Sequence, residues 1–290
     1  MYGSLTRDIM GAIGSVVMPT SGEIFRALHE SSEAFIIPNP WDVGSAKILA
    51  ALGFKALATT SAGLAFSLGV SEGEISRDAV LRHCREVVDA TPLPVSADLE
   101  KGFGDSPESV HETIQAAAAT GLAGCSIEDH TGDKRNPIYE FDLALERIEA
   151  AVSACASLEG EFILTARAES FLWGGTDLHE VIARLKAFED AGADVLYAPG
   201  LRDLETIRTV CAALSKPVNV VMGLPGATFG LEDLAEAGVK RVSVGSALAR
   251  HAYGGLIRAG REMAESGTFG FADEAAGFAE IDKLIAQGSS

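Results

Sequence analysis

Short apolar runs alternate with longer amphipathic segments along most of this chain. The apolar runs have the length of buried strands and lie at residues 34–40, 55–61, 93–100, 124–130, 162–170, 193–200, 216–222 and 239–245. One segment with helical spacing precedes the first run, at residues 23–30, and others lie between the runs, at residues 43–52, 74–90, 107–120, 141–157, 177–191, 203–214 and 231–237. Such alternation is typical of parallel strands linked by helices. The pattern predicts an α/β fold, a (β/α)8 TIM-type barrel.

A glycine marks the junction between a helix and the next strand in four places. Gly53, Gly121, Gly192 and Gly238 each follow a helical segment and precede an apolar run. Glycine readily adopts the left-handed backbone that ends many helices, so these joints repeat one supersecondary unit. No stretch with the composition of a linker divides the repeats. We therefore expect one barrel domain over residues 22–265.

Both ends of the chain lie outside the repeating pattern. Residues 1–21 lack firm periodicity and are expected to form an N-terminal extension, loose or with a short helix. Helical patterns return at residues 247–266 and 273–286, and we assign residues 266–290 to a C-terminal helical extension. A barrel needs only one closing helix, so the surplus helices are expected to pack on a neighbouring subunit.

Composition and charge narrow the classes of partner. The chain has 290 residues, is 47% hydrophobic, and carries 41 acidic against 23 basic residues, for a net charge of −18. Nucleic acids and anionic membranes bind basic patches, so neither is expected as a partner. No apolar run reaches the length of a membrane span. The four scattered cysteines indicate reduced thiols and a cytoplasmic location.

The candidate chemistry begins where the third apolar run ends. Asp98 and Glu100 follow this run, two residues apart, and a Gly-x-Gly turn follows them. Alternate side chains of a strand share one face, so both carboxylates are expected to point into a pocket. Buried carboxylates repel each other and protonate unless a cation lies between them. A hard divalent cation, Mg²⁺ or Mn²⁺, is the cofactor that this pair predicts, although a solvated strand end without metal is the alternative.

Other strand ends add further acids and one arginine. Catalytic groups of TIM barrels lie at the carboxyl ends of the strands. Glu128 follows the fourth run, Arg167 the fifth, and Asn219 lies in the seventh. Arg167 could bind a substrate carboxylate through two parallel hydrogen bonds, or it could form a structural salt bridge with Glu128 or Glu169. Asn219 could bind substrate or simply cap the barrel end.

Several motifs in a fixed order resemble the isocitrate lyase/phosphoenolpyruvate (PEP) mutase superfamily. They are Pro38-Asn-Pro-Trp-Asp42, Thr59-Thr-Ser-Ala-Gly63, Ser96-Ala-Asp-Leu-Glu-Lys-Gly-Phe-Gly104, Ser126-Ile-Glu-Asp-His-Thr-Gly-Asp133, Thr165-Ala-Arg-Ala-Glu169, Ala193-Asp-Val-Leu-Tyr-Ala-Pro-Gly200 and Pro217-Val-Asn219. The resemblance covers residues 22–265. It implies a homo-oligomeric enzyme, a dimer of dimers whose subunits exchange C-terminal helices, that acts on small carboxylates with Mg²⁺.

The resemblance also implies roles for single residues. Asp98 corresponds to the main metal-binding aspartate of the superfamily, Glu100 and Glu128 to ligands that reach the metal through water, and Asp42 to the metal side of the pocket. For the substrate, the implied set is Thr60, Ser61, Ala62, Asp98, Arg167 and Asn219. The implied catalytic set is Arg167 and Glu128, with Lys134 and Asn136 from the loop after the fourth strand.

That loop is where the chain departs from the superfamily. Isocitrate and methylisocitrate lyases carry a Lys-Lys-Cys-Gly-His loop with a catalytic thiol, whereas residues 130–137 are shorter here and contain no cysteine. Lys134 and Asn136 match the Lys-x-Asn pair of the phosphonate enzymes, but Pro199 replaces the histidine that those enzymes carry after strand six. Lys134, Asn136 and His130 could equally be surface residues of the loop.

Three functions follow from these observations. The first is a Mg²⁺-dependent lyase or decarboxylase that cleaves a C–C bond of a small 2-oxo or 2-hydroxy carboxylate through a metal-stabilised enolate, such as an oxaloacetate decarboxylase or a substituted-malate lyase. The second is a phosphonate enzyme that makes or breaks a P–C bond, of the PEP mutase or phosphonopyruvate hydrolase type. The third is a non-catalytic barrel that binds a keto acid.

Overall fold

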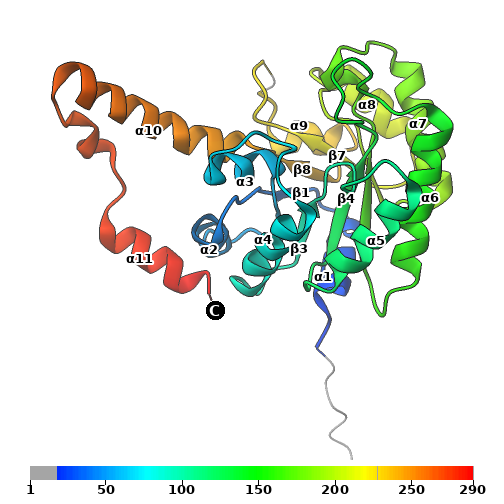
Figure 1. The fold of residues 1–290 in the computed structure, drawn as a ribbon, viewed down its shortest axis with the longest axis horizontal. Coiled ribbons are helices and arrows are strands. Elements are labelled where there is room, and N and C mark those ends of the chain that lie inside the picture. The colour runs from blue at the N-terminus through cyan, green and yellow to red at the C-terminus, as the bar shows by residue number, and fades with distance from the viewer. Residues whose placement is uncertain (1–17, 227, 290) are drawn as a thin grey trace, which may run out of the picture.

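Eight parallel strands form a nearly closed barrel surrounded by helices (Figure 1). The computed structural model describes residues 18–226 and 228–289. The strands are β1 (Phe35–Ile37), β2 (Leu57–Ala58), β3 (Val95–Asp98), β4 (Gly124–Glu128), β5 (Ile163–Arg167), β6 (Val195–Tyr197), β7 (Val218–Val221) and β8 (Arg241–Ser243). Their hydrogen-bonded order is β1-β8-β7-β6-β5-β4-β3-β2. The predicted (β/α)8 barrel is confirmed.

The helices are α1 (Ser21–Glu30), α2 (Val43–Ala51), α3 (Ser61–Leu68), α4 (Arg77–Asp89), α5 (Pro107–Ala118), α6 (Phe141–Ala156), α7 (Leu178–Ala191), α8 (Leu204–Ala213), α9 (Leu231–Glu236), α10 (Ala247–Ser266) and α11 (Phe278–Gln287). Two 3-10 helices, η1 (Ser170–Trp173) and η2 (Gly270–Glu274), complete the list. No described helix combines the length and the apolar character that crossing a membrane requires.

The elements follow the predicted order, with one helix that the sequence pattern did not indicate. Each strand falls within its predicted apolar run and is shorter than that run. The missed helix is α3, which begins at Ser61, a residue assigned to the second strand. Thr60 caps α3 by accepting a hydrogen bond from Gly63 N over 3.3 Å. Apolar positions lie all around α3, so it has no amphipathic period to detect.

The barrel closes between β1 and β2 with few main-chain bonds. Ala58 N donates to Pro38 O over 3.1 Å, but the two strands form no ladder. Asn39 replaces the missing ladder at the carboxyl end of the barrel. Its Nδ2 donates to Thr59 O over 3.0 Å, and its Oδ1 accepts hydrogen bonds from Val244 N and Gly245 N, each over 2.9 Å. One buried side chain therefore joins the ends of β1, β2 and β8.

The opposite, amino-terminal end of the barrel is covered by α1. Phe25 of α1 is fully buried and packs in a cluster with Phe35 and Ile37 of β1 and with Ile163 of β5. Thr20 and Glu23 form a capping box that starts the helix. The predicted N-terminal extension lies almost wholly in residues 1–17, outside the described residues.

The last two helices extend away from the barrel. Figure 1 shows α10 running outward from the barrel, after which the chain turns and α11 returns toward α2. Within this chain α11 packs against α2. Several large apolar side chains of this region are exposed: Leu256, Ile257, Met263, Phe269 and Phe278. Exchange of these helices between subunits and the domain bounds at residues 21/22 and 265/266 stay predictions.

Candidate active site

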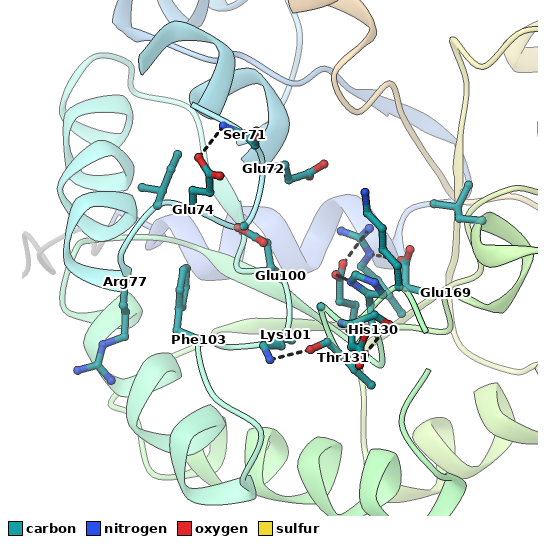
Figure 2. A pocket seen from close by; sticks show the side chains of 18 of the residues that line it. Ser71, Glu72, Glu74, Arg77, Glu100, Lys101, Phe103, His130, Thr131 and Glu169 are labelled. Carbon is teal, nitrogen blue, oxygen red and sulfur yellow. Dashed lines mark hydrogen bonds and ion pairs between the residues drawn. The ribbon is translucent and has the colours of Figure 1, made fainter. Parts of the chain in front are cut away.

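Two adjoining cavities lie at the carboxyl ends of the strands, where the site was expected. The outer cavity has a volume of about 1460 Å³ and is lined by loop residues that follow β2 to β5. The inner cavity has a volume of about 200 Å³ and enters the barrel. Glu72, Arg167 and Leu172 line both cavities. Figure 2 shows the outer cavity, with Glu100 near Glu72 and Glu74 on one side and Lys101 on the other.

Arg167 lies at the centre of the site and contacts three carboxylates. Its Nη1 is 3.0 Å from Asp98 Oδ1, its Nη2 is 3.0 Å from Glu128 Oε2, and its Nε is 2.8 Å from Glu169 Oε1. The guanidinium also lies 5.1 Å from the ring centre of Tyr197. Burial alone would lower the pKa of Arg167, but the carboxylates raise it well above its usual value. Arg167 is thus a permanent cation.

Asp98 ends β3 and receives hydrogen bonds from the start of α3. Its Oδ2 accepts from Ser61 Oγ over 2.9 Å and from Ser61 N over 3.2 Å. Its main-chain N donates to Thr59 Oγ1 over 3.0 Å. Asp98 lines the inner cavity, and its side chain keeps 18% of its exposure. The carboxylate is therefore fixed in position while one side stays open to a ligand.

Glu100 lies in a strained turn, and its side chain faces the outer cavity. Its φ is +50°, a backbone conformation unusual for a residue other than glycine, and Phe103 has a φ of +61°. The predicted alternation therefore ends at Asp98, and the two carboxylates line different cavities. Burial, together with Asp98 and Glu72, raises the pKa of Glu100 to about 7.

A buried arginine on α6 holds this turn. Arg147 Nη1 donates to Gly104 O over 2.9 Å and to Asp105 O over 2.5 Å, and its Nη2 donates to Lys101 O. The guanidinium lies 4.4 Å from the ring centre of Tyr139, whose hydroxyl donates to Asp105 Oδ1 over 2.5 Å. Arg147 is 1% exposed. These bonds satisfy three carbonyls that the turn leaves without main-chain partners.

Three buried acids of the site, Glu128, Asp129 and Glu169, are driven toward the protonated form. Burial raises the pKa of Glu128 well above its usual value, and it raises the pKa of Glu169 as well, although Arg167 opposes both shifts. Burial also raises the pKa of Asp129 to about 7. Asp129 accepts a hydrogen bond from Glu169 N over 2.8 Å and lies 3.4 Å from Arg184. The site holds more acids than one arginine can neutralise.

Glu72 belongs to this cluster and was missed in the sequence. It accepts a hydrogen bond from Ser61 Oγ over 2.6 Å, and the same hydroxyl bonds to Asp98. Glu72 lies in the loop between α3 and α4, outside any strand end, so a search restricted to strand ends could not find it. Its signal would have been an acid within the polar, glycine-containing stretch that follows Leu68.

Asp42, predicted on the metal side of the pocket, lies apart from the cluster. It is exposed, caps α2 by accepting a hydrogen bond from Ser45 N over 2.7 Å, and lines neither cavity. Its role as a metal ligand stays a prediction.

The loop after β4 forms a small turn at the rim of the outer cavity. Thr131 N donates to Pro137 O over 2.8 Å, and Thr131 Oγ1 donates to Asn136 O over 2.6 Å. Lys134 is exposed and lines the outer cavity, whereas Asn136 is exposed and does not line it. His130 lies deeper: its ring stacks on Trp173 at 4.1 Å, and its Nδ1 is 3.7 Å from Glu128.

The predicted substrate residues gather at the inner cavity. Thr60, Ser61, Ala62, Asp98, Arg167 and Asn219 all line it. Asn219 is 1% exposed; its Nδ2 donates to Ser243 Oγ over 3.0 Å and its Oδ1 accepts from Arg241 Nε over 2.8 Å. Their roles in binding stay predictions, but the structure brings all six to one cavity.

The donor chemistry of the site fits a hard cation that keeps several waters. Asp98, Glu100 and Glu128 offer only oxygen, which Mg²⁺ prefers, and Mg²⁺ commonly binds through one or two carboxylates. Among the described residues, no group of three His, Cys, Asp or Glu side chains lies close enough to form a complete cage. Direct ligation by Asp98 with water-mediated contacts to the other two is the arrangement that these positions would permit.

Comparison with known proteins places this site in a family. Residues 25–264 match the phosphoenolpyruvate phosphomutase family. The 2-methylisocitrate lyase of Salmonella typhimurium is 30% identical over 228 residues, which cover 75% of this chain and 76% of that enzyme. A Burkholderia cenocepacia J2315 protein, provisionally described as a lyase or mutase, is 55% identical, with a TM-score of 0.89 over 92% of this chain and 95% of that one. Oxaloacetate acetylhydrolase, solved with its product oxalate, is 26% identical, with a TM-score of 0.82 over 92% of this chain and 94% of that one.

The chain belongs to the phosphoenolpyruvate phosphomutase family, within the isocitrate lyase/PEP mutase superfamily. It is an enzyme, and the relatives place it in the carbon–carbon lyase class of that superfamily.

Proposed function

We propose that this enzyme is a Mg²⁺-dependent lyase that cleaves a C–C bond of a small 2-oxo or 2-hydroxy carboxylate. The observation that carries the proposal is the contact of Arg167 with Asp98, Glu128 and Glu169 where the two cavities meet. The cluster has the excess of acids that a divalent cation would neutralise. It also has a cation, Arg167, that would hold a substrate carboxylate.

Asp98, with Glu100 and Glu128 through water, would hold the Mg²⁺, and Mn²⁺ could replace it. The bound ion would supply Lewis-acid stabilisation of the negative charge that develops on the substrate oxygens. Arg167 orients the substrate by contacting its carboxylate, and Ser61 and Thr60 shape the wall beside it. The indole of Trp173 stacks on the ring of His130, and the two rings form part of the wall of the outer cavity.

Delivery of the proton that completes the reaction does not require a thiol. The four cysteines are Cys84, Cys125, Cys155 and Cys211, and none lines either cavity. Burial raises the pKa of each, which keeps them as neutral thiols. Water, or a residue of the loop after β4, therefore delivers the proton. This favours substrates whose enolate is protonated by solvent, as in oxaloacetate decarboxylation or the release of pyruvate from a substituted malate.

A phosphonate substrate is the second candidate, supported by Lys134 at the outer cavity and by the family match. Pyruvate release from oxaloacetate, from substituted malates and from phosphonopyruvate, each with Mg²⁺ and with EDTA, separates the two. We expect Mg²⁺-dependent turnover of a C–C substrate that Asp98→Ala abolishes. Activity that survives both EDTA and Asp98→Ala would contradict either metal mechanism. A protein that turns over none of these substrates, and whose melting temperature Mg²⁺ and oxalate do not raise, would be the non-catalytic barrel.

We further infer that the enzyme works in the cytoplasm as a dimer of dimers. The exposed apolar side chains of α10 and the following segment support the assembly, which sedimentation velocity would test.

A further inference from the structure

One arginine inside the barrel has no acidic partner. Arg241 begins β8 and is 5% exposed, and it lines the inner cavity. Its Nε donates to Asn219 Oδ1 over 2.8 Å, its Nη2 donates to Thr165 Oγ1 over 2.9 Å, and its Nη1 lies 3.2 Å from His29 Nε2. These bonds use three of the five N–H groups of a guanidinium.

All three partners of Arg241 are neutral. His29 Nδ1 lies 2.8 Å from Phe25 O, a carbonyl that only accepts, so Nδ1 carries the hydrogen and Nε2 accepts from Arg241. Burial and the nearby arginine lower the pKa of His29 to about 3, so the ring is uncharged. Burial lowers the pKa of Arg241 to about 10, which leaves it charged at neutral pH.

The other buried arginines of the described chain are compensated. Arg167 contacts three carboxylates, and Arg184 lies within 3.4 Å of Asp129 and 2.9 Å of Glu180. Burial lowers the pKa of Arg147, which binds carbonyls, but Tyr139 and three nearby acids, Asp105, Asp129 and Glu128, oppose this shift. Only Tyr197 does so for Arg241. A buried charge without a counter-charge is unfavourable unless a ligand supplies one.

Arg241 lies deeper in the barrel than Arg167, and the strand β5 shows by how much. Thr165, which accepts from Arg241, lies on β5 two residues before Arg167 and therefore on the same inward face. Two strand residues span about 6.6 Å. Ser96, one layer below Asp98 on β3, also lines the inner cavity. Besides the exposed Arg250 of α10, which binds Gly223 O, the cavity thus has Arg167 near its mouth and Arg241 one layer deeper, a separation that suits the two carboxylates of a four-carbon acid.

We propose that Arg241 forms a second carboxylate site at the floor of the inner cavity, which makes the substrate a 2-hydroxy dicarboxylate with its second carboxylate next to the bond that breaks. This inference rests on the proposed lyase function. In the reaction, the 2-hydroxyl gives up its proton to a base and the C2–C3 bond breaks. The C2 oxygen becomes a carbonyl, and the electron pair passes to C3 and its carboxylate. C3 then takes up a proton.

Arg241 has a chemical role in such a step. Negative charge grows on the carboxylate beside C3 as the bond breaks, so the guanidinium contacts the transition state more strongly than the substrate. The same contact opposes loss of this carboxylate as CO₂, because neutral CO₂ would leave Arg241 without its counter-charge. The site therefore favours a substituted-malate lyase over a decarboxylase.

The test compares malate with lactate, which lacks the second carboxylate, as ligands of the Mg²⁺-loaded protein in calorimetry. Wild type should bind malate at least about tenfold more tightly than lactate, because a charged hydrogen bond is worth that factor. Arg241→Gln should reduce the ratio to about one, while affinity for oxalate stays within about twofold. Lys240→Gln is the matched control, since it removes the neighbouring charge from a half-buried side chain that binds Ser31 O and Glu33 O and does not line the cavity.

A second variant keeps the inference testable if Arg241→Gln does not fold. Thr165→Asp places an acid beside Nη2, so it should neutralise Arg241 without removing it and also reduce the malate/lactate ratio to about one. An equal affinity of wild type for both acids, or a ratio unchanged in both variants, would overturn the inference. If Mg²⁺ and oxalate fail to bind but succinate raises the melting temperature of wild type and not of Arg241→Gln, the Arg241 site stands while the lyase function fails.

Discussion

Arg167 Nη1 on β5 donates to Asp98 Oδ1 on β3 over 3.0 Å, although the two residues are 69 positions apart in the chain. The strand between them, β4, brings Glu128 to the same guanidinium. Three neighbouring strands thus place their terminal side chains in one ion cluster, in which Arg167 of the predicted substrate-binding set contacts Asp98 and Glu128 of the predicted metal-binding set.

Replacement of Arg167 should abolish most of the activity. Arg167→Lys keeps the charge but loses the planar fork that contacts three acids, so kcat/KM should fall by about 10²- to 10³-fold. Steady-state assays with whichever of the candidate substrates the wild-type enzyme turns over measure this effect. Arg135→Lys, at a 91% exposed side chain of the rim loop, is the control and should change little. An Arg167→Lys enzyme with near-normal activity would mean that Arg167 is only a structural ion pair.

Glu72→Gln tests the residue that the sequence did not reveal. Loss of its charge weakens the hydrogen bond to Ser61, the hydroxyl that fixes Asp98, so the apparent affinity for Mg²⁺ should fall by about 10- to 100-fold. A titration of Mg²⁺ against activity or melting temperature measures the change. Glu74→Gln removes an equal charge from the same loop, where the acid bonds only to Ser71 N, and should leave the affinity near that of wild type.

Stability without metal should depend on the ionisation of Glu100. The folded protein raises its pKa to about 7, above the ordinary value of 4.5, so the protonated form favours folding. This contribution is complete below pH 4.5 and is lost as the pH rises through 7. One pKa unit is worth about 1.4 kcal/mol, and partial solvent exposure reduces the full effect to the order of 2 kcal/mol.

Glu100→Gln keeps the neutral form at every pH. In EDTA, its free energy of unfolding should match that of wild type near pH 4.5 and exceed it near pH 8. Urea titrations at both pH values measure the difference. The exposed Glu159→Gln should show no such divergence. A constant difference between Glu100→Gln and wild type across this range would refute the assignment.

Arg147 should control the turn that carries Glu100. Arg147→Lys can satisfy fewer of the three carbonyls, so unfolding free energy should fall by about 2 to 4 kcal/mol, and affinity for Mg²⁺ should fall with it. Arg85→Lys is the matched control, because Arg85 also donates to a carbonyl, Ala119 O, but from an exposed position. Equal losses in the two variants would show that burial of Arg147 contributes nothing to the site.

Much of the architecture could be predicted from the sequence, because each strand and each helix after it has its own periodic signal. The positions of Asp98, Glu128 and Arg167 followed, since the ends of parallel strands meet at one face. Glu72 could not be predicted, because a loop residue enters the site through the path of the loop. The alternation that placed Glu100 beside Asp98 failed at the φ of +50°, in a turn whose carbonyls are bound by Arg147, a residue distant in the sequence. Arg241 could not be predicted either, because it lies at the start of a strand and the search covered only strand ends. Its place in the inner cavity is visible only in the structure.

The bonds of Asn39 bear on which part of this barrel exchanges its amide hydrogens first. Seven of the eight strand junctions are ladders that must separate together, whereas β1 and β2 are joined at the carboxyl end mainly through one side-chain amide. Local opening should therefore begin at this junction and expose the Ala58 amide before those of β4 and β5. Because Thr60 and Ser61 follow β2 directly, the same opening would loosen the wall of the inner cavity. The junction between β1 and β2, which leads into the active site, is thus the part of the barrel expected to open most easily.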